Sequence, residues 1–174
     1  SLTDVRGIWR LQGSLAASPR LTELVGMRLG TLDDAERDAL EVVSVGEPVP
    51  LETIGALADR ACIERLEARA LIDIEAEGNA RHVRMGHPLY GEVLRGDLTS
   101  GRYERICRQL ADAMEDDGEL SAEDALRLAV WRLESGDTEH AGLLMIAAQQ
   151  AGFSFDFPLA RRLARAAWDA GAGV

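Results

Sequence analysis

A single histidine occupies the position in this sequence that is most informative about chemistry. His87 follows a predicted β-hairpin and directly precedes Pro88, which suits the first position of a helix because no N–H is needed there. His87 therefore falls at or beside a helix N-cap, where unpaired amides and the positive end of the helix dipole attract anions and favour the neutral imidazole. This position makes His87 a candidate phosphate sensor. The alternative is a structural histidine that satisfies backbone groups at a turn.

The sequence contains none of the common local signatures of a catalytic or metal centre. It has no GxSxG nucleophile motif and no HExxH metal-binding helix. The three histidines, His82, His87 and His140, are too few and too scattered to predict a metal cluster. Neighbouring carboxylates such as Asp33 and Asp34 lie at predicted helix starts, where they stabilise the helix dipole. We therefore expect no catalytic residues and no metal.

All 19 basic residues are arginine, which excludes two kinds of chemistry. A Walker A loop needs a lysine to reach the β- and γ-phosphates of a nucleotide, and Schiff-base chemistry needs a primary amine, so neither can be built from this sequence. The net charge of −11 would repel a phosphate backbone, because the arginines are interleaved with Asp and Glu along the chain. General affinity for nucleic acids is therefore disfavoured.

Cysteine usage and hydropathy predict a soluble cytoplasmic protein. Cys62 and Cys107 stand singly in predicted helices without a CxxC pair, so we expect buried thiols of a reducing compartment. The longest apolar run, Leu143 to Ala148, is far shorter than the roughly 20 residues that span a bilayer. Ser1 is not a start methionine, and the last predicted helix calls for a partner. We therefore expect the chain to be an excised piece of a longer protein.

Residues 20–98 carry the pattern of a winged-helix domain, in which short helices are followed by a two-stranded wing. Residues 1–19 before it are predicted to be a linker or an edge strand, because residues 7–11 alternate apolar and polar side chains. Residues 72–75 and 82–85 alternate with period two around the turn at 77–79, as in a β-hairpin. Amphipathic helices are predicted over residues 19–28, 33–46 and 51–57, over about 61–71, and from 87 or 88 onward.

The wing must pack on the helices, because an isolated hairpin is only marginally stable in water. Its inward side chains are expected to be Ile72, Ile74, Val83 and Met85, each contributing roughly 1.5–3 kcal/mol if fully buried. We therefore expect Ile74→Asp to unfold this half of the chain.

A winged helix often reads DNA through the second helix of its helix-turn-helix, which here would span about 61–71. The outward side of that helix is expected to present Glu64, Arg65, Glu67 and Arg69, whose charges cancel. A groove-reading helix usually carries arginine, lysine, asparagine or glutamine without competing carboxylates. We therefore expect no direct DNA binding by this helix.

Residues 99–174 are predicted to form antiparallel helical hairpins similar to tetratricopeptide repeats. Arg127-Leu128-Ala129 and Arg162-Leu163-Ala164 match at an offset of 35 residues, close to the tetratricopeptide period of about 34. Because stacked repeats bury each other's apolar faces, a truncated array would expose one face and could form a homodimer. Helices are predicted over 102–115, 122–134, 138–151 and 158–170, and packing between them is the expected role of Trp131, Phe153, Phe155, Phe157 and Trp168.

With these elements in place, the sequence resembles the large ATP-binding regulators of the LuxR type, within the signal-transducing STAND ATPases. Of four matching stretches, the one from His87 to Arg95 is the most specific. Met85-Gly86-His87 is similar to the Met-His-Asp form of plant relatives, with a glycine inserted and Pro88 in place of the aspartate. The other stretches are Ala17 to Leu21 with Arg28-Leu29, Leu32 to Arg37, and Phe155 to Ala164.

The resemblance implies that this chain is the middle of a longer protein. An N-terminal nucleotide-binding module would precede it and a promoter-binding LuxR-type domain would follow it. Members of the wider class place a histidine after the wing toward the β-phosphate of bound ADP, and His87 is the matching residue. The expected cofactor is therefore ATP or ADP in the parent protein, with none in this segment alone. The expected partners are the nucleotide-binding module and an effector or protein on the helical repeat.

The sequence thus predicts a non-catalytic regulatory segment that couples nucleotide state to a helical sensor region. One alternative is a free-standing winged-helix repressor that binds DNA and dimerises through its helical arm. Such a repressor would show salt-sensitive DNA affinity in this segment alone. A second alternative is a small helical enzyme that uses His87 as acid or base with Glu92 or Tyr90 nearby.

Overall fold

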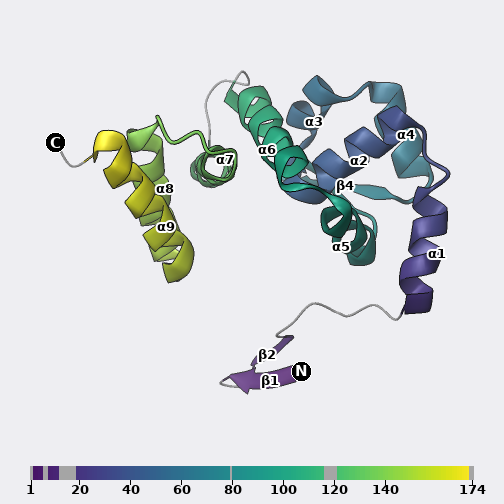
Figure 1. The fold of residues 1–174 in the computed structure, drawn as a ribbon, viewed down its shortest axis with the longest axis horizontal. Coiled ribbons are helices and arrows are strands. Elements are labelled where there is room, and N and C mark those ends of the chain that lie inside the picture. Colours follow the sequence, from purple (N-terminus) through teal and green to yellow (C-terminus); the bar gives the residue numbers. More distant parts are fainter. Residues whose placement is uncertain (1, 6–7, 12–18, 79, 116–120, 173–174) are drawn as a thin grey trace.

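The computed structural model describes residues 2–5, 8–11, 19–78, 80–115 and 121–172 (Figure 1). Over these residues the fold is mainly helical, with a three-stranded antiparallel sheet and a separate N-terminal hairpin. The predicted mainly α fold class is therefore confirmed. Within the same ranges, no helix combines the length and the apolar character needed to cross a bilayer.

The N-terminal hairpin pairs strands β1 (Leu2–Val5) and β2 (Ile8–Leu11) antiparallel to each other. The strand predicted at residues 7–11 is thus present from Ile8, but it is paired, where a linker or a lone edge strand was expected. A lone strand leaves a row of unpaired backbone N–H and C=O groups, which an antiparallel neighbour satisfies. Residues 12–18 of the predicted linker lie outside the described residues.

The larger of the two cores lies around helix α2 (Asp34–Gly46). Leu40 and Val43 on its inner face are almost fully buried, at the helical spacing that the sequence predicted. Helix α2 contacts each of the next four helices, whereas α1 contacts α5 (Figure 1). These helices are α1 (Pro19–Leu29), α3 (Leu51–Leu57), α4 (Arg60–Ala68), α5 (Pro88–Asp97) and α6 (Ser100–Glu115).

The sheet that lies against this core has the strand order β3-β5-β4. Strands β4 (Ile72–Glu77) and β5 (Ala80–Met85) form the predicted hairpin, which is therefore confirmed. Strand β3 (Val49–Pro50) pairs with the other edge of β5 and was not predicted, because two residues are too few to show a period of two. The central strand β5 thus gains a hydrogen-bonded neighbour on each side.

The inner face of the hairpin packs as predicted at three of its four positions. Ile72, Val83 and Met85 are buried in the core. Ile74 pairs with Val83 but is only partly buried, because it lies on the edge strand β4, whereas Val83 lies on the central strand β5. The packing energy of the wing therefore comes mainly from Ile72 on β4 and from Val83 and Met85 on β5.

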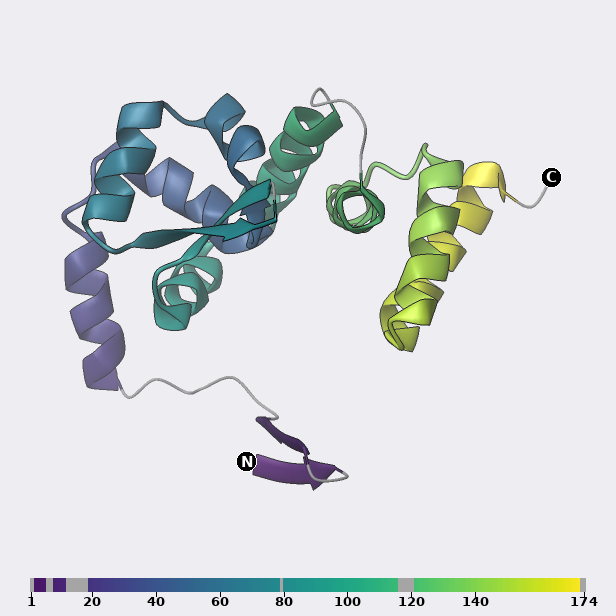
Figure 2. The ribbon, with the colours of Figure 1, turned by 180° about the vertical axis from the view of Figure 1, so that it is seen from behind.

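The second core is formed by α7 (Ala122–Glu134), α8 (Ala141–Phe153) and α9 (Phe157–Ala167). Both ribbon views show α8 and α9 side by side, with α7 between them and α6 (Figures 1 and 2). Small side chains such as Ala147 and Ala151 are fully buried there and allow the helices to approach closely. The chain then continues through an irregular helical turn, Trp168–Ala172.

A buried arginine joins the two cores. Arg132 of α7 is 6% exposed, and its guanidinium lies 2.8 Å from Asp112 and 2.7 Å from Glu115 at the end of α6. A third carboxylate, Asp137, lies 3.1 Å away in the turn after α7. Because a buried charge is tolerated only when it is paired, these contacts hold α7 in one position on α6.

The predicted packing role of the aromatic residues is confirmed for Trp131 and wrong for the others. Trp131 is 5% exposed between the helices. Phe153, Phe155, Phe157 and Trp168 are 63 to 80% exposed. They lie at the turn between α8 and α9 and at the end of α9, outside the interface that the alanines already fill.

Candidate functional site

His87 is the N-cap of α5, as the sequence predicted. Its backbone is extended (φ −153°, ψ 136°), Pro88 follows in the first turn, and the side-chain Nδ1 accepts a hydrogen bond from the amide of Leu89 at 3.2 Å. This bond satisfies one of the unpaired amides that every helix start carries.

The cap bond also determines which ring nitrogen is available for a ligand. While Nδ1 accepts the Leu89 N–H, the single proton of the neutral imidazole resides on Nε2. The side chain of His87 is exposed, so Nε2–H is free to donate to a group in solution. A phosphate oxygen is a suitable acceptor, and the N-terminus of α5 favours its negative charge.

Gly86 sets the position of His87 by a close approach of two backbones. Its amide donates to the carbonyl of Leu71 at 2.9 Å. A Cβ atom at this position would lie only 2.5 Å from the carbonyl oxygen of Ala70, a distance that real Cβ contacts do not reach. The glycine between Met85 and His87, for which the sequence indicated no role, is therefore required by this contact across the base of the hairpin.

Glu47 holds both chain segments that flank His87. One carboxylate oxygen accepts the Met85 amide at 2.9 Å, and the other lies 3.1 Å from the guanidinium of Arg95 on α5. Arg95 also donates to the carbonyl of Ser44 at the end of α2. Sequence reasoning missed Glu47 and Arg95, since no local pattern marks a partner 48 residues away.

An aromatic ring and a cation lie beside this corner. The rings of His87 and Tyr90 meet edge to face with their centroids 6.1 Å apart. The guanidinium of Arg28, from the end of α1, lies 5.6 Å from the Tyr90 ring centroid, within the range of a cation–π contact. Arg28 also donates to the carbonyl of Arg69 at 2.5 Å. Among the residues that the structure describes, Arg28 has no carboxylate partner, so its positive charge is not neutralised locally.

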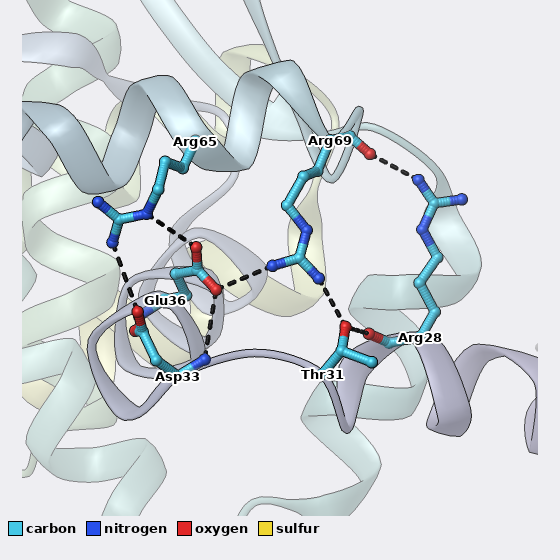
Figure 3. Close-up of polar contacts among 6 residues, drawn as sticks. All are labelled: Arg28, Thr31, Asp33, Glu36, Arg65 and Arg69. Atoms are coloured by element: carbon cyan, nitrogen blue, oxygen red, sulfur yellow. Dashed lines mark hydrogen bonds and ion pairs between the residues drawn. The ribbon is translucent and has the colours of Figure 1, made fainter.

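Arg69 connects this corner to a buried carboxylate (Figure 3). Glu36 is 5% exposed and lies 2.9 Å from Arg69 and 3.0 Å from Arg65. Its backbone amide donates to Asp33, whose amide in turn donates to the Glu36 carboxylate, so the two residues form a capping box at the start of α2. The predicted capping role of Asp33 is thus confirmed.

The arginine contacts decide the ionisation of Glu36. The hydrogen bond from Arg65 is the largest influence and lowers the pKa of the Glu36 carboxyl, while burial opposes it. The same bond raises the pKa of Arg65. Both groups therefore stay charged at neutral pH, and the pair links the start of α2 to α4.

These contacts also determine which arginine side chains of and beside helix α4 are free to bind a ligand. The helical pattern predicts an outward position for Arg65 and Arg69, whereas the structure turns both toward Glu36 at the start of α2. The remaining arginine of α4, Arg60, lies 2.9 Å from Glu64 on the same helix. Within the described part of α4, each arginine is therefore paired with a carboxylate.

Both cysteines are buried and free, as predicted. Burial raises the pKa of the Cys62 thiol and raises that of Cys107 to about 11. Thiols with raised pKa values are poor nucleophiles at neutral pH. Neither cysteine therefore adds a reactive group to the fold.

Comparison of the chain with protein-family models, with curated proteins and with solved structures finds no match.

Proposed function

We propose that the chain is a non-catalytic regulatory segment of a LuxR-type, ATP-dependent transcriptional regulator of the STAND class. His87 contacts a phosphate of the nucleotide held by a neighbouring module of the same protein. The observation that carries this proposal is the exposed Nε2–H of His87 at the N-terminus of α5, oriented by the cap bond to Leu89. Helices α7 to α9 receive the effector or protein partner.

The order of the elements supports the finer architecture of the proposal. Helices α2, α3 and α4 precede the β4–β5 hairpin, and β3 pairs with its free edge, as in a winged helix over residues 20–98. The side-by-side packing of α8 and α9, with α7 against α8, supports tetratricopeptide-like hairpins over residues 99–174.

The proposed mechanism is a conformational switch. Exchange of ADP for ATP changes the contact at His87, and the winged helix then moves as a rigid body relative to the nucleotide-binding module. The contacts of Gly86 with Leu71 and of Glu47 with Met85 and Arg95 support rigid movement, because they tie β5 and α5 to the rest of the core. The movement alters self-association and the exposure of a distant DNA-binding domain.

Helix α4 supports this proposal over the DNA-binding repressor. Arg65 and Arg69 would be the natural phosphate and base contacts of a recognition helix. Both are held by Glu36, a pairing that DNA binding would have to break. Direct DNA binding by this segment is therefore not part of the proposed function.

The decisive experiment separates the phosphate contact of His87 from its capping role. Asparagine is a preferred N-cap residue, but its side chain is too short to place an N–H where Nε2–H of His87 lies. His87→Asn therefore removes the phosphate contact and retains the cap. ADP affinity is measured by calorimetry on the full-length regulator proposed here. We expect His87→Asn to weaken ADP binding about tenfold or more without loss of thermal stability.

The matched control is His140→Asn. His140 is the exposed N-cap of α8 and makes no side-chain cap bond, so its replacement changes the same residue type at the same kind of position. ADP affinity should be unchanged in this control. If His87→Asn binds ADP like the wild type, and His87→Ala lowers stability without changing ADP affinity, His87 is a structural cap and the sensor role is wrong.

A further inference from the structure

Helix α9 carries three arginines within one stretch of five residues, Arg161, Arg162 and Arg165. Arg162 lies 2.6 Å from Glu134 at the end of α7. Arg161 and Arg165 have no carboxylate within ion-pair distance among the residues that the structure describes, although the whole chain carries a net charge of −11. Two uncompensated guanidiniums one helical turn apart form a local positive field on an acidic protein.

The same arginines line a groove. A cavity of about 540 Å³ lies between α9 and the C-terminal end of α7, with Leu133 and Ala166 as its apolar surface and Thr138 beside it. Arg161 and Arg165 border the groove from α9, and Asp169 is the acidic residue in its lining. The groove thus combines apolar contact with guanidinium groups that converge on one volume.

Two exposed aromatic residues flank Arg161 and Arg165 along α9. Phe157 is 63% exposed and Trp168 is 67% exposed. Together with Arg161 and Arg165 they recur at intervals of four, four and three residues, which places all four side chains on one face of the helix. At 1.5 Å per residue this face extends about 17 Å from Phe157 to Trp168.

The length of this face, and its order of an aromatic residue, two arginines and a second aromatic residue, indicate the class of ligand. A single phosphate or carboxylate would occupy the two arginines and leave both aromatic ends exposed to water. We infer that the α9 face binds an acidic peptide segment of a partner protein, with two carboxylates opposite Arg161 and Arg165 and an apolar side chain at each end. Guanidinium groups pair with carboxylates through two parallel hydrogen bonds, and apolar anchors on Phe157 and Trp168 fix the register.

This inference rests on the proposed role of α7 to α9 as a receiver of a partner, and it does not involve His87. The test therefore uses the 174-residue chain alone, without nucleotide. The probe is a labelled, end-capped peptide of about twelve residues, matched to a helical face of this length, with Leu at each end and two Glu four residues apart. Binding is measured by fluorescence anisotropy.

We expect the double variant Arg161→Glu with Arg165→Glu to weaken peptide binding about tenfold or more, and a peptide with Lys in place of Glu to restore it. The matched control makes the same charge change at Arg20 and Arg105, exposed arginines of α1 and α6, and should bind like the wild type. The double variant Phe157→Ala with Trp168→Ala should also weaken binding while retaining the helix.

Three results would overturn the inference. The first is no binding of the acidic peptide by the wild type. The second is an equal loss of binding in the Arg20 and Arg105 control, which would indicate only a response to net charge. The third is full competition by inorganic pyrophosphate with no effect of the aromatic variants, which would indicate a simple oxyanion site. None of these results bears on the ADP measurement, so the two proposals fail separately.

Discussion

The carboxylate of Glu36 and the guanidinium of Arg69 lie 2.9 Å apart, although 33 residues separate them in the sequence. The pair joins the first turn of α2 to the end of α4. Through the carbonyl of Arg69 and the side chain of Arg28, the same set of contacts reaches Tyr90 and the His87 corner. The stability of this junction is therefore a condition for the geometry of the candidate site.

Replacement of Glu36 by glutamine should destabilise the fold. Glu36→Gln retains the shape but removes the charge that Arg65 and Arg69 share, and we expect a loss of about 1 to 2 kcal/mol, since Arg65 is half exposed and solvent weakens its contribution. The free energy of unfolding in urea measures this loss. The control Glu64→Gln removes an exposed pair with Arg60 and should change stability by less than about 0.5 kcal/mol. Equal effects of the two variants would contradict a special role for Glu36.

The same carboxylate predicts an acid limit of stability. Its pKa in the folded protein is lowered from the ordinary value of 4.5, so the folded state favours the charged form. The stabilisation is therefore complete above pH 4.5 and is lost as the pH falls through the folded pKa. Unfolding curves between pH 7 and pH 3 should converge for the wild type and Glu36→Gln at the acid end. A stability difference that persists unchanged at low pH would exclude the charge of the Glu36 carboxylate as its cause.

A methyl group at Gly86 should disrupt the base of the wing. In Gly86→Ala the new Cβ would lie 2.5 Å from the Ala70 carbonyl oxygen, so the two backbones must separate and the Leu71 hydrogen bond weakens. We expect a loss of about 1 to 3 kcal/mol, in the range of overpacking. The control is Gly96→Ala in α5, where no atom lies within 4 Å of the new Cβ and helix propensity should leave stability unchanged or raised. Thermal unfolding of both variants distinguishes a steric clash at Gly86 from an effect that any glycine-to-alanine change would have.

Polar substitutions in the wing should differ in severity. Val83 is fully buried in the central strand, so Val83→Asp should abolish cooperative unfolding of the first core. Ile74 is only partly buried, and Ile74→Asp should lower stability less than Val83→Asp, contrary to the complete unfolding expected from the sequence. Circular dichroism and urea titration of the two variants test this order. The reverse order would show that the hairpin packs differently on the helices.

Local signals in the sequence predicted most of the elements. Asp33 marks the start of α2, and His87 with Pro88 marks the start of α5, because capping contacts act within three residues. Period-two alternation predicted β4 and β5 and their turn. Two short features were missed: β3 is too brief to show a pattern, and the strand before Ile8 was read as linker. The winged-helix and repeat interpretations remain predictions.

The sequence by itself thus determined the helices, the hairpin, the N-cap position of His87 and the exclusion of lysine chemistry, because each depends on residue types or on neighbours within about one helical turn. The tertiary structure decided which distant residues meet. It placed Glu47 against Met85, turned Arg65 and Arg69 toward Glu36, and left Phe157 and Trp168 outside the interface that small alanines fill. Periodicity shows which face of a helix is apolar, but whether a partner covers that face depends on how the elements pack in three dimensions.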